Sequence, residues 1–144
     1  MSLYWTGESI TNFIIVKEEC LSNQFRVDLS YIKDEADKSI NELALKEEIK
    51  ELAISMRLSK GIIHFQIINR DGKSFFLECM RRLPGDLYSR LVELSSGWKY
   101  HCSYLAPFTN ELVIDEKSAY RKTNDFLRAS VSGLTKDKIV NSIV

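Results

Sequence analysis

Alternating apolar and polar positions predict two strands early in the chain. Residues 13–19 read FIIVKEE and are rich in β-branched side chains, and residues 24–31 read QFRVDLSY, in which every second side chain is apolar. A period of two residues is typical of a strand with one solvated face. Residues 21–23, LSN, suit the short turn of an antiparallel pair. We assign no element before Phe13 and give Met1-Ser2-Leu3 no weight in the interpretation.

A change of period predicts a helix over residues 41–58, after a polar segment at 33–39. Ser39 and Glu42 match the S-x-x-E capping box, in which each side chain accepts a hydrogen bond from a free backbone N–H at a helix start. Gly61 follows the predicted end, as is common after helices. The charged side is interpreted as solvated surface. The apolar stripe consists of Leu45, Ile49, Leu52, Ala53 and Met56.

Residues 61–82 predict a β-hairpin, because GIIHFQIIN and KSFFLECMRR flank the turn sequence RDG. Directly opposed residues share a sheet face. A three-residue loop, 70–72, pairs Gln66 with Phe76 and His64 with Glu78, and it leaves an apolar set on the opposite face, as a core face requires. We therefore predict an odd-length loop, with Glu78 on the face away from the helices. The same register places His64, Gln66, Glu78, Met80 and Arg82 together, and Ile63, Phe65, Ile67, Leu77 and Cys79 on the apolar side.

Two further helices are predicted after the hairpin. Pro84 suits a first helical position, and Gly97 suits a left-handed stop. Residues 98–106 predict more helical turns, ended by Pro107. Beyond it, residues 107–144 stay unassigned, with candidate strands at ELVI (111–114) and FLRASVSGL (126–134). Antiparallel strand pairs with helices between them predict an α+β fold, an antiparallel sheet with helices packed on one face.

Composition fits one globular domain spanning residues 1–144. The 44% hydrophobic content is sufficient for a core, and 20 basic against 20 acidic residues leave no basic excess for nucleic acid. The sequence has neither an apolar run of membrane-spanning length nor a signal-peptide pattern. Three scattered cysteines predict reduced thiols and a cytoplasmic location, and two histidines are too few for a zinc cluster.

Residues 61–100 resemble the C-terminal lobe of ATP-grasp ligases. In that family a strand reading G-x-x-H-x-E pairs with one reading E-x-N-x-R. RLPGD (82–86) and LVELSSG (91–97) are similar to stretches in family members that ligate amino acids or small carboxylates. Residues 14–31 are similar to the segment that links the two ATP-binding lobes of the family. The resemblance covers about residues 13 to 105, so we expect a fragment of a longer protein. The matching positions are Gly61, His64, Gln66, Glu78, Met80 and Arg82.

The resemblance implies ligation of a carboxylate to an amine or similar nucleophile through an acyl-phosphate, with ATP and Mg²⁺ as cofactors. Such phosphoryl transfer depends on positioning and on neutralising phosphate charge. Its implied partners are ATP, a small carboxylate and the missing N-terminal nucleotide lobe, so the fragment alone is expected to be inactive. The implied site residues are Glu78 and Gln66 for metal, Arg82 for gripping a phosphate or carboxylate, and Glu18, Glu19 and His64 for the nucleotide.

Two departures from the family pattern keep other interpretations open. Gln66 is neutral where the family has a carboxylate, and Met80 offers a thioether, which Mg²⁺ disfavours, where the family has asparagine. The chain is alternatively a non-catalytic relative that acts as a nucleotide-binding or interaction module, or an unrelated α+β interaction domain. Glu78 is then a surface residue paired with Arg82 or His64. His64 is then a structural hydrogen-bonding residue, and Glu18 and Glu19 are simply the end of a strand.

Overall fold

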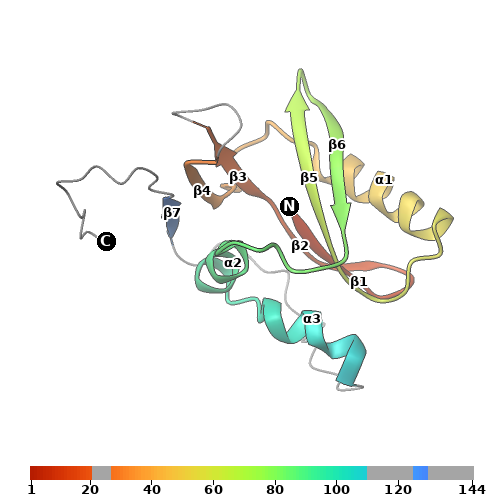
Figure 1. Ribbon diagram of the computed structural model, residues 1–144. Helices are drawn as coiled ribbons and strands as arrows, with labels where there is room; N and C mark the ends of the chain where they lie inside the picture. Colours follow the sequence, from red (N-terminus) through yellow and green to blue (C-terminus); the bar gives the residue numbers. More distant parts are fainter. Residues whose placement is uncertain (21–26, 110–124, 130–144) are drawn as a thin grey trace.

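The computed structural model describes residues 1–20, 27–109 and 125–129 (Figure 1). Within these ranges the chain forms three helices and seven strands, in the α+β class that the pattern predicts. The strands are β1 (Ser2–Trp5), β2 (Ile10–Ile14), β3 (Val16–Glu19), β4 (Leu29–Ile32), β5 (Gly61–Arg70), β6 (Lys73–Met80) and β7 (Leu127–Ala129). The helices are α1 (Glu42–Ser55), α2 (Tyr88–Ser96) and α3 (Tyr100–Thr109).

The described strands form two antiparallel sheets. The larger has the order β2-β1-β5-β6 and the smaller the order β3-β4-β7. The predicted strand at 13–19 is divided between them, because β2 pairs with β1 whereas β3 pairs with β4. The predicted antiparallel partner of β3, residues 24–31, is confirmed for residues 29–31. The LSN turn lies outside the described residues.

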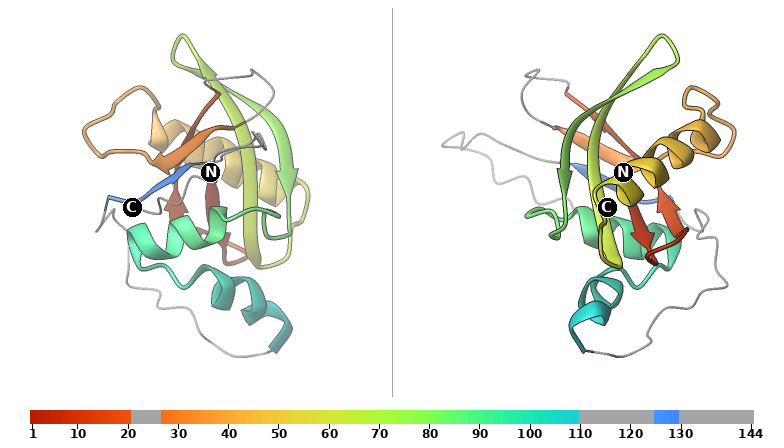
Figure 2. Two further views of the ribbon diagram at one scale, coloured as in Figure 1. Left: turned by 60° about the vertical axis from the view of Figure 1, so that its left-hand side comes forward. Right: turned by 90° about the vertical axis from the view of Figure 1, so that its right-hand side faces the viewer.

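Helices cover both faces of the larger sheet, so the prediction of helices on one face is wrong (Figures 1 and 2). On one face, Ile49 of α1 packs in a cluster with Leu3 and Phe65. On the other, residues of α2 and α3 pack with side chains of both sheets. That second cluster contains Tyr4, Ile14, Val16, Ile32, Ile62, Tyr88, Leu91, Val92, Trp98 and Tyr100.

The first residues form a central strand, although the sequence patterns assign no element before Phe13. β1 lies between β2 and β5, and each of its four residues is buried. Because both faces of this strand are covered, its sequence shows no alternation of apolar and polar positions, and a period-based search misses it.

Helix α1 is shorter than predicted and is capped by a different residue. Asn41 is the N-cap, its side chain accepting a hydrogen bond from the Ala44 backbone N–H at 3.1 Å. The proposed capping box of Ser39 and Glu42 is wrong, because the Glu42 carboxylate instead pairs with Lys33 Nζ at 2.9 Å. Met56 is 59% exposed and lies outside the buried stripe, which the structure confirms for Leu45, Ile49 and Ala53.

The remaining elements differ from prediction mainly at their ends. Helix α2 begins at Tyr88 rather than Pro84, and the Asp86 carboxylate accepts a hydrogen bond from the Tyr88 backbone N–H at 2.9 Å. Gly97 ends α2 with φ 74°, as predicted. Pro107 does not end α3, which continues to Thr109. Of the candidate tail strands, 127–129 is present in β7, and 111–114 lies outside the described residues.

Candidate functional site

The β5–β6 hairpin closes with a two-residue turn, so the predicted three-residue loop is wrong. Arg70 pairs directly with Lys73, and the two residues between them have positive φ, 52° at Asp71 and 75° at Gly72. Positive φ at both central positions characterises the type I′ turn that Asp-Gly favours. Figures 1 and 2 show this turn reaching well beyond the helices.

A β-bulge in β6 nevertheless brings the predicted residues to one face. Ile67 pairs with Phe76 but the preceding Gln66 pairs with Glu78, which leaves Leu77 as an extra residue. Gln66 therefore lies directly opposite Glu78, and His64 opposite Met80, rather than in the predicted pairs. Leu77 was expected on the apolar face, but it is 57% exposed at the bulge.

A pocket of about 510 Å³ lies beside this face. Strand β3, strand β5, the end of β6 and the segment 84–88 form its walls. Three of the predicted site residues, Glu18, His64 and Gln66, line it together with Met80, and Asp86 joins them from the loop before α2. Residues as far apart in the sequence as Glu18 and Asp86 therefore line the same pocket.

The other predicted site residues do not line the pocket. Glu78 is exposed beside Gln66 and makes no ion pair within the described part of the chain, so the suggested pairing with Arg82 or His64 is not found. Arg82 is exposed and donates to the Leu83 carbonyl at 3.1 Å. Glu19 accepts a hydrogen bond from the Tyr31 hydroxyl at 2.6 Å, and alternation along β3 separates it from Glu18.

His64 is held by buried polar contacts. Its Nδ1 is hydrogen-bonded to Ser2 Oγ at 2.8 Å, and Ser2 Oγ is hydrogen-bonded in turn to the Tyr100 hydroxyl at 2.7 Å. The rings of His64 and Tyr88 pack edge to face, with their centroids 4.7 Å apart. Burial, and then the nearby α-amino group of Met1, lower the pKa of His64 to about 3. The imidazole is therefore neutral at physiological pH, which fits the structural interpretation of this residue.

A row of charged and polar side chains crosses the smaller sheet towards the pocket. Glu18 pairs in register with Ser30, which pairs with Arg128. The Arg128 guanidinium donates to Ser30 Oγ at 2.8 Å and to the Asp86 carboxylate. Sequence reasoning missed Arg128 because it lies in the unassigned tail, far in sequence from Asp86.

The two carboxyl groups at the pocket have opposite pKa shifts. Burial raises the pKa of Glu18, and the positive charges of the Met1 amine and Arg128 offset this only in part. Burial also acts to raise the pKa of Asp86, but hydrogen bonds from Arg128 and from the Tyr88 backbone outweigh it and lower the pKa. Asp86 is therefore a persistent anion already paired with Arg128, whereas no hydrogen bond or ion pair of the Glu18 carboxyl is found among the described residues.

The side chains at this site can hold a divalent cation only if a bound ligand supplies further oxygen atoms. The described residues contain no group of three or more His, Cys, Asp or Glu side chains placed to hold a metal ion. Gln66 and Glu78 offer one amide oxygen and one carboxylate, and Met80 a thioether. Mg²⁺ is often held by one or two carboxylates completed by substrate phosphates and water. The pair therefore suits Mg²⁺ that arrives with a nucleotide.

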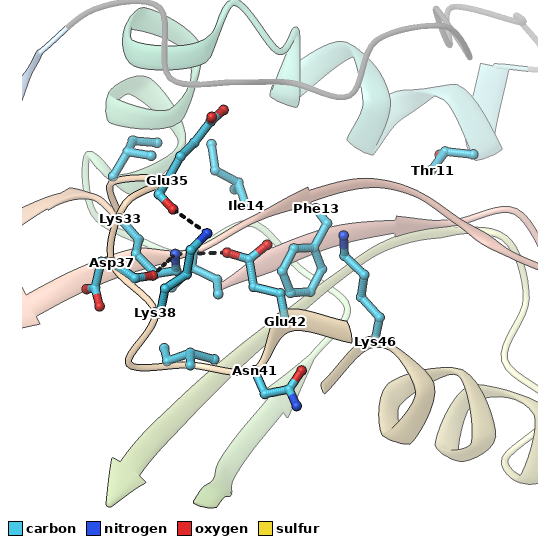
Figure 3. A pocket seen from close by; sticks show the side chains of 13 residues that line it. Thr11, Phe13, Ile14, Lys33, Glu35, Asp37, Lys38, Asn41, Glu42 and Lys46 are labelled. Atoms are coloured by element: carbon cyan, nitrogen blue, oxygen red, sulfur yellow. Dashed lines mark hydrogen bonds and ion pairs between the residues drawn. The ribbon is translucent and has the colours of Figure 1, made fainter. Parts of the chain in front are cut away.

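A second pocket, of about 730 Å³, lies at the start of α1 and contains none of the predicted site residues (Figure 3). Two of its three lysines are already engaged by oxygens of the protein. Lys33 Nζ donates to the Asp37 carbonyl at 2.8 Å and pairs with Glu42, and Lys38 Nζ donates to the Glu35 carbonyl at 2.9 Å. This pocket is interpreted as the anchored junction between the 33–41 segment and α1.

Comparison of the chain with family models, with curated proteins and with solved structures finds no match. The helices of the described residues include none with the length and apolar content of a membrane span. All three cysteines, Cys20, Cys79 and Cys102, are free and exposed. The class defined by the fold is thus an α+β domain with an open pocket where its two sheets meet.

Proposed function

We propose that this chain is the C-terminal lobe of an ATP-grasp protein that ligates a carboxylate to an amine or similar nucleophile. The observation that carries the proposal is the pairing of Gln66 with Glu78 across β5 and β6, beside a pocket that His64 and Met80 also line. The sequence resemblance requires these positions to share one sheet face. The bulge at Leu77 supplies that arrangement, although the turn alone would prevent it.

In this proposal the residues that line the pocket bind the nucleoside of ATP, and the exposed residues beside the pocket neutralise the phosphate charge. Glu18 accepts hydrogen bonds from the ribose or adenine of ATP, and the neutral His64 forms part of the pocket wall. Gln66 and Glu78 hold Mg²⁺, which when bound offsets the negative charge of the phosphates. Arg82 is exposed and bonded only to a neighbouring carbonyl among the described groups, so it is available to grip the transferred phosphate or the substrate carboxylate.

A second candidate is a non-catalytic relative that binds nucleotide without metal-dependent chemistry. The observation that favours it is that the proposed metal-binding pair holds a single carboxylate, Glu78, and that Met80 follows it on the same face of β6. We place either protein in the cytoplasm, in line with three free and exposed cysteines.

An NMR titration of the isotope-labelled chain with ATP tests the proposal and separates the two candidates. The ligase lobe is expected to show Mg²⁺-dependent shifts of the backbone amides of Glu18, Gln66 and Glu78. Replacing Mg²⁺ with paramagnetic Mn²⁺ should broaden the signals of Gln66 and Glu78 first. The non-catalytic relative should show the same shifts with and without metal. Shifts confined to the α1 pocket, or none at millimolar ATP, would contradict both.

A further inference from the structure

The junction of α2 and α3 contains a serine, a histidine and a glutamate in hydrogen-bond contact. Ser89 and Glu93 lie one turn apart on α2, and His101 is near the start of α3. His101 Nε2 is 3.1 Å from Ser89 Oγ, and its Nδ1 is 2.9 Å from Glu93 Oε1. The His101 backbone N–H also donates to Glu93 Oε1, at 3.2 Å, which fixes the start of α3 against the same carboxylate.

The partners of the imidazole decide which of its nitrogens carries the proton. An ionised carboxylate only accepts hydrogen bonds, so Nδ1 donates to Glu93. In the neutral ring Nε2 is then the acceptor, and the Ser89 hydroxyl donates to it. The hydrogen bond from His101 helps lower the pKa of Glu93 against the opposing effect of burial, so the carboxylate remains charged. This is the order of contacts that activates a serine for nucleophilic attack.

We propose that Ser89 is a nucleophile for small activated acyl esters, with His101 as its general base and Glu93 as the residue that positions the imidazole. Ser89 Oγ attacks the ester carbonyl while its proton passes to His101 Nε2. The carbon–oxygen bond to the leaving alcohol then breaks, and His101 returns the proton to that alcohol. Water hydrolyses the resulting acyl-serine by the same route, which regenerates the hydroxyl and releases the carboxylic acid.

Accessibility restricts the substrate. Ser89 is 6% exposed, whereas the His101 side chain is 47% exposed, so an ester reaches the serine from the imidazole side and its acyl group must be small. The first turn of α2 has backbone N–H groups without intrahelical acceptors. Those of Tyr88 and Leu91 bond to Asp86 and Leu87, which leaves the N–H groups of Ser89 and Arg90 as the nearest candidates to stabilise an oxyanion.

This inference is independent of the proposed ligase function, because none of the three residues lines the nucleotide pocket. The test uses the whole 144-residue chain and a fluorophosphonate probe, which a serine nucleophile attacks with loss of fluoride. Mass spectrometry of the labelled protein is expected to place the phosphonyl group on Ser89, with slow turnover of p-nitrophenyl acetate. An unlabelled chain, or one labelled elsewhere, would overturn the proposal without any variant.

Variants test the assigned roles. S89A should abolish labelling, and H101Q should slow it by about 10²- to 10⁴-fold, the usual contribution of a general base. E93Q, which keeps the size of the side chain, should slow labelling by roughly tenfold or more while the chain remains folded. S55A is the matched control, because Ser55 is a helical serine whose hydroxyl donates to a carbonyl instead of an imidazole. Unchanged labelling of a folded H101Q variant would refute the mechanism.

Discussion

His64 shows how a single buried residue serves both the core and the pocket. It is 8% exposed, bonded to Ser2 and faced by Tyr88, yet one side of it lines the pocket. Its low pKa follows chiefly from burial, which disfavours the charged imidazolium. The neutral ring carries no charge, so His64 contributes shape rather than charge to the pocket.

Protonation of His64 should make the protein acid-sensitive. The folded-state pKa of about 3 lies below the ordinary value of 6.5, so the unfolded state binds the proton first and stability is lost as pH falls below about 6.5. Between pH 8 and pH 5 this amounts to about 2 kcal/mol of unfolding free energy. H64N keeps an amide where Nδ1 meets Ser2 and removes the titration. Urea unfolding at both pH values should show that H64N loses less unfolding free energy between pH 8 and pH 5 than the unaltered protein, by that amount. Equal losses in the two proteins would contradict the low pKa assigned to His64.

At the scale of the elements, the bulge in β6 determines where the site residues point. A two-residue turn with regular pairing would place Glu78 on the face of α1. The extra residue Leu77 reverses the alternation between Phe76 and Glu78, so Glu78 and Met80 return to the face of Gln66 and His64. The site depends on this irregularity rather than on the length of the loop.

Deleting Leu77 should therefore be tolerated. The shortened strand pairs regularly and keeps Gln66 opposite Glu78, and an exposed apolar side chain is removed. Deleting Cys79 is the matched control, since it moves Met80 opposite Phe65 and forces the following residues into the wrong face. We expect the first deletion to change stability by less than about 1 kcal/mol and the second to cost more than about 2 kcal/mol, measured by chemical unfolding. Equal losses would show that the bulge is not a removable insertion.

The start of α1 offers a second test at this scale. Asn41 caps the helix through its side chain, whereas the Ser39 hydroxyl bonds to the Asp37 carboxylate, outside the helix. N41A should cost about 1 kcal/mol of unfolding free energy, as typical N-cap losses do. S39A should remain within about 0.5 kcal/mol of the unaltered protein. Thermal unfolding of the two variants side by side measures the difference, and a larger loss in S39A would restore the rejected capping box.

Sequence patterns predicted the elements better than their arrangement. Periodicity identified the helix over α1, because its solvated face leaves a clear signal, and the Asp-Gly turn between two apolar runs identified the hairpin. It missed β1, whose residues are buried on both sides, and it could not detect the bulge, since an extra residue leaves the local composition unchanged. Asp86 and Arg128 meet only through tertiary contact, so nothing in either local sequence indicated the pair.

At the scale of the whole molecule, the proposed nucleotide pocket is one-sided. Its walls come from the two sheets and the 84–88 segment, and in the resembling family ATP lies between two lobes. In the proposed function, contacts from this one lobe would position the nucleotide but would not enclose the transferred phosphate. Exclusion of water and full charge neutralisation, on which phosphoryl transfer depends, then require the other lobe.

The isolated 144-residue chain should accordingly have no ligase activity. A coupled assay with ATP, Mg²⁺ and a panel of amino acids and small carboxylates is expected to detect no ADP release above the buffer rate. R82A, which removes the proposed phosphate-gripping side chain, serves as the control for background hydrolysis. ADP release that needs a carboxylate and disappears in R82A would show that one lobe is sufficient, contrary to this prediction.

The most direct test of the proposed function restores the oxygen ligands that this chain lacks. Q66E places a carboxylate opposite Glu78, and M80N replaces the thioether with an amide oxygen. Calorimetric titration should show that the double variant binds Mg·ATP at least several-fold more tightly than the unaltered chain, where tenfold corresponds to about 1.4 kcal/mol. With ATP and a chelator the gain should vanish. Equal Mg·ATP affinity of the two folded proteins would contradict the account, because Gln66, Glu78 and Met80 would then not surround the metal.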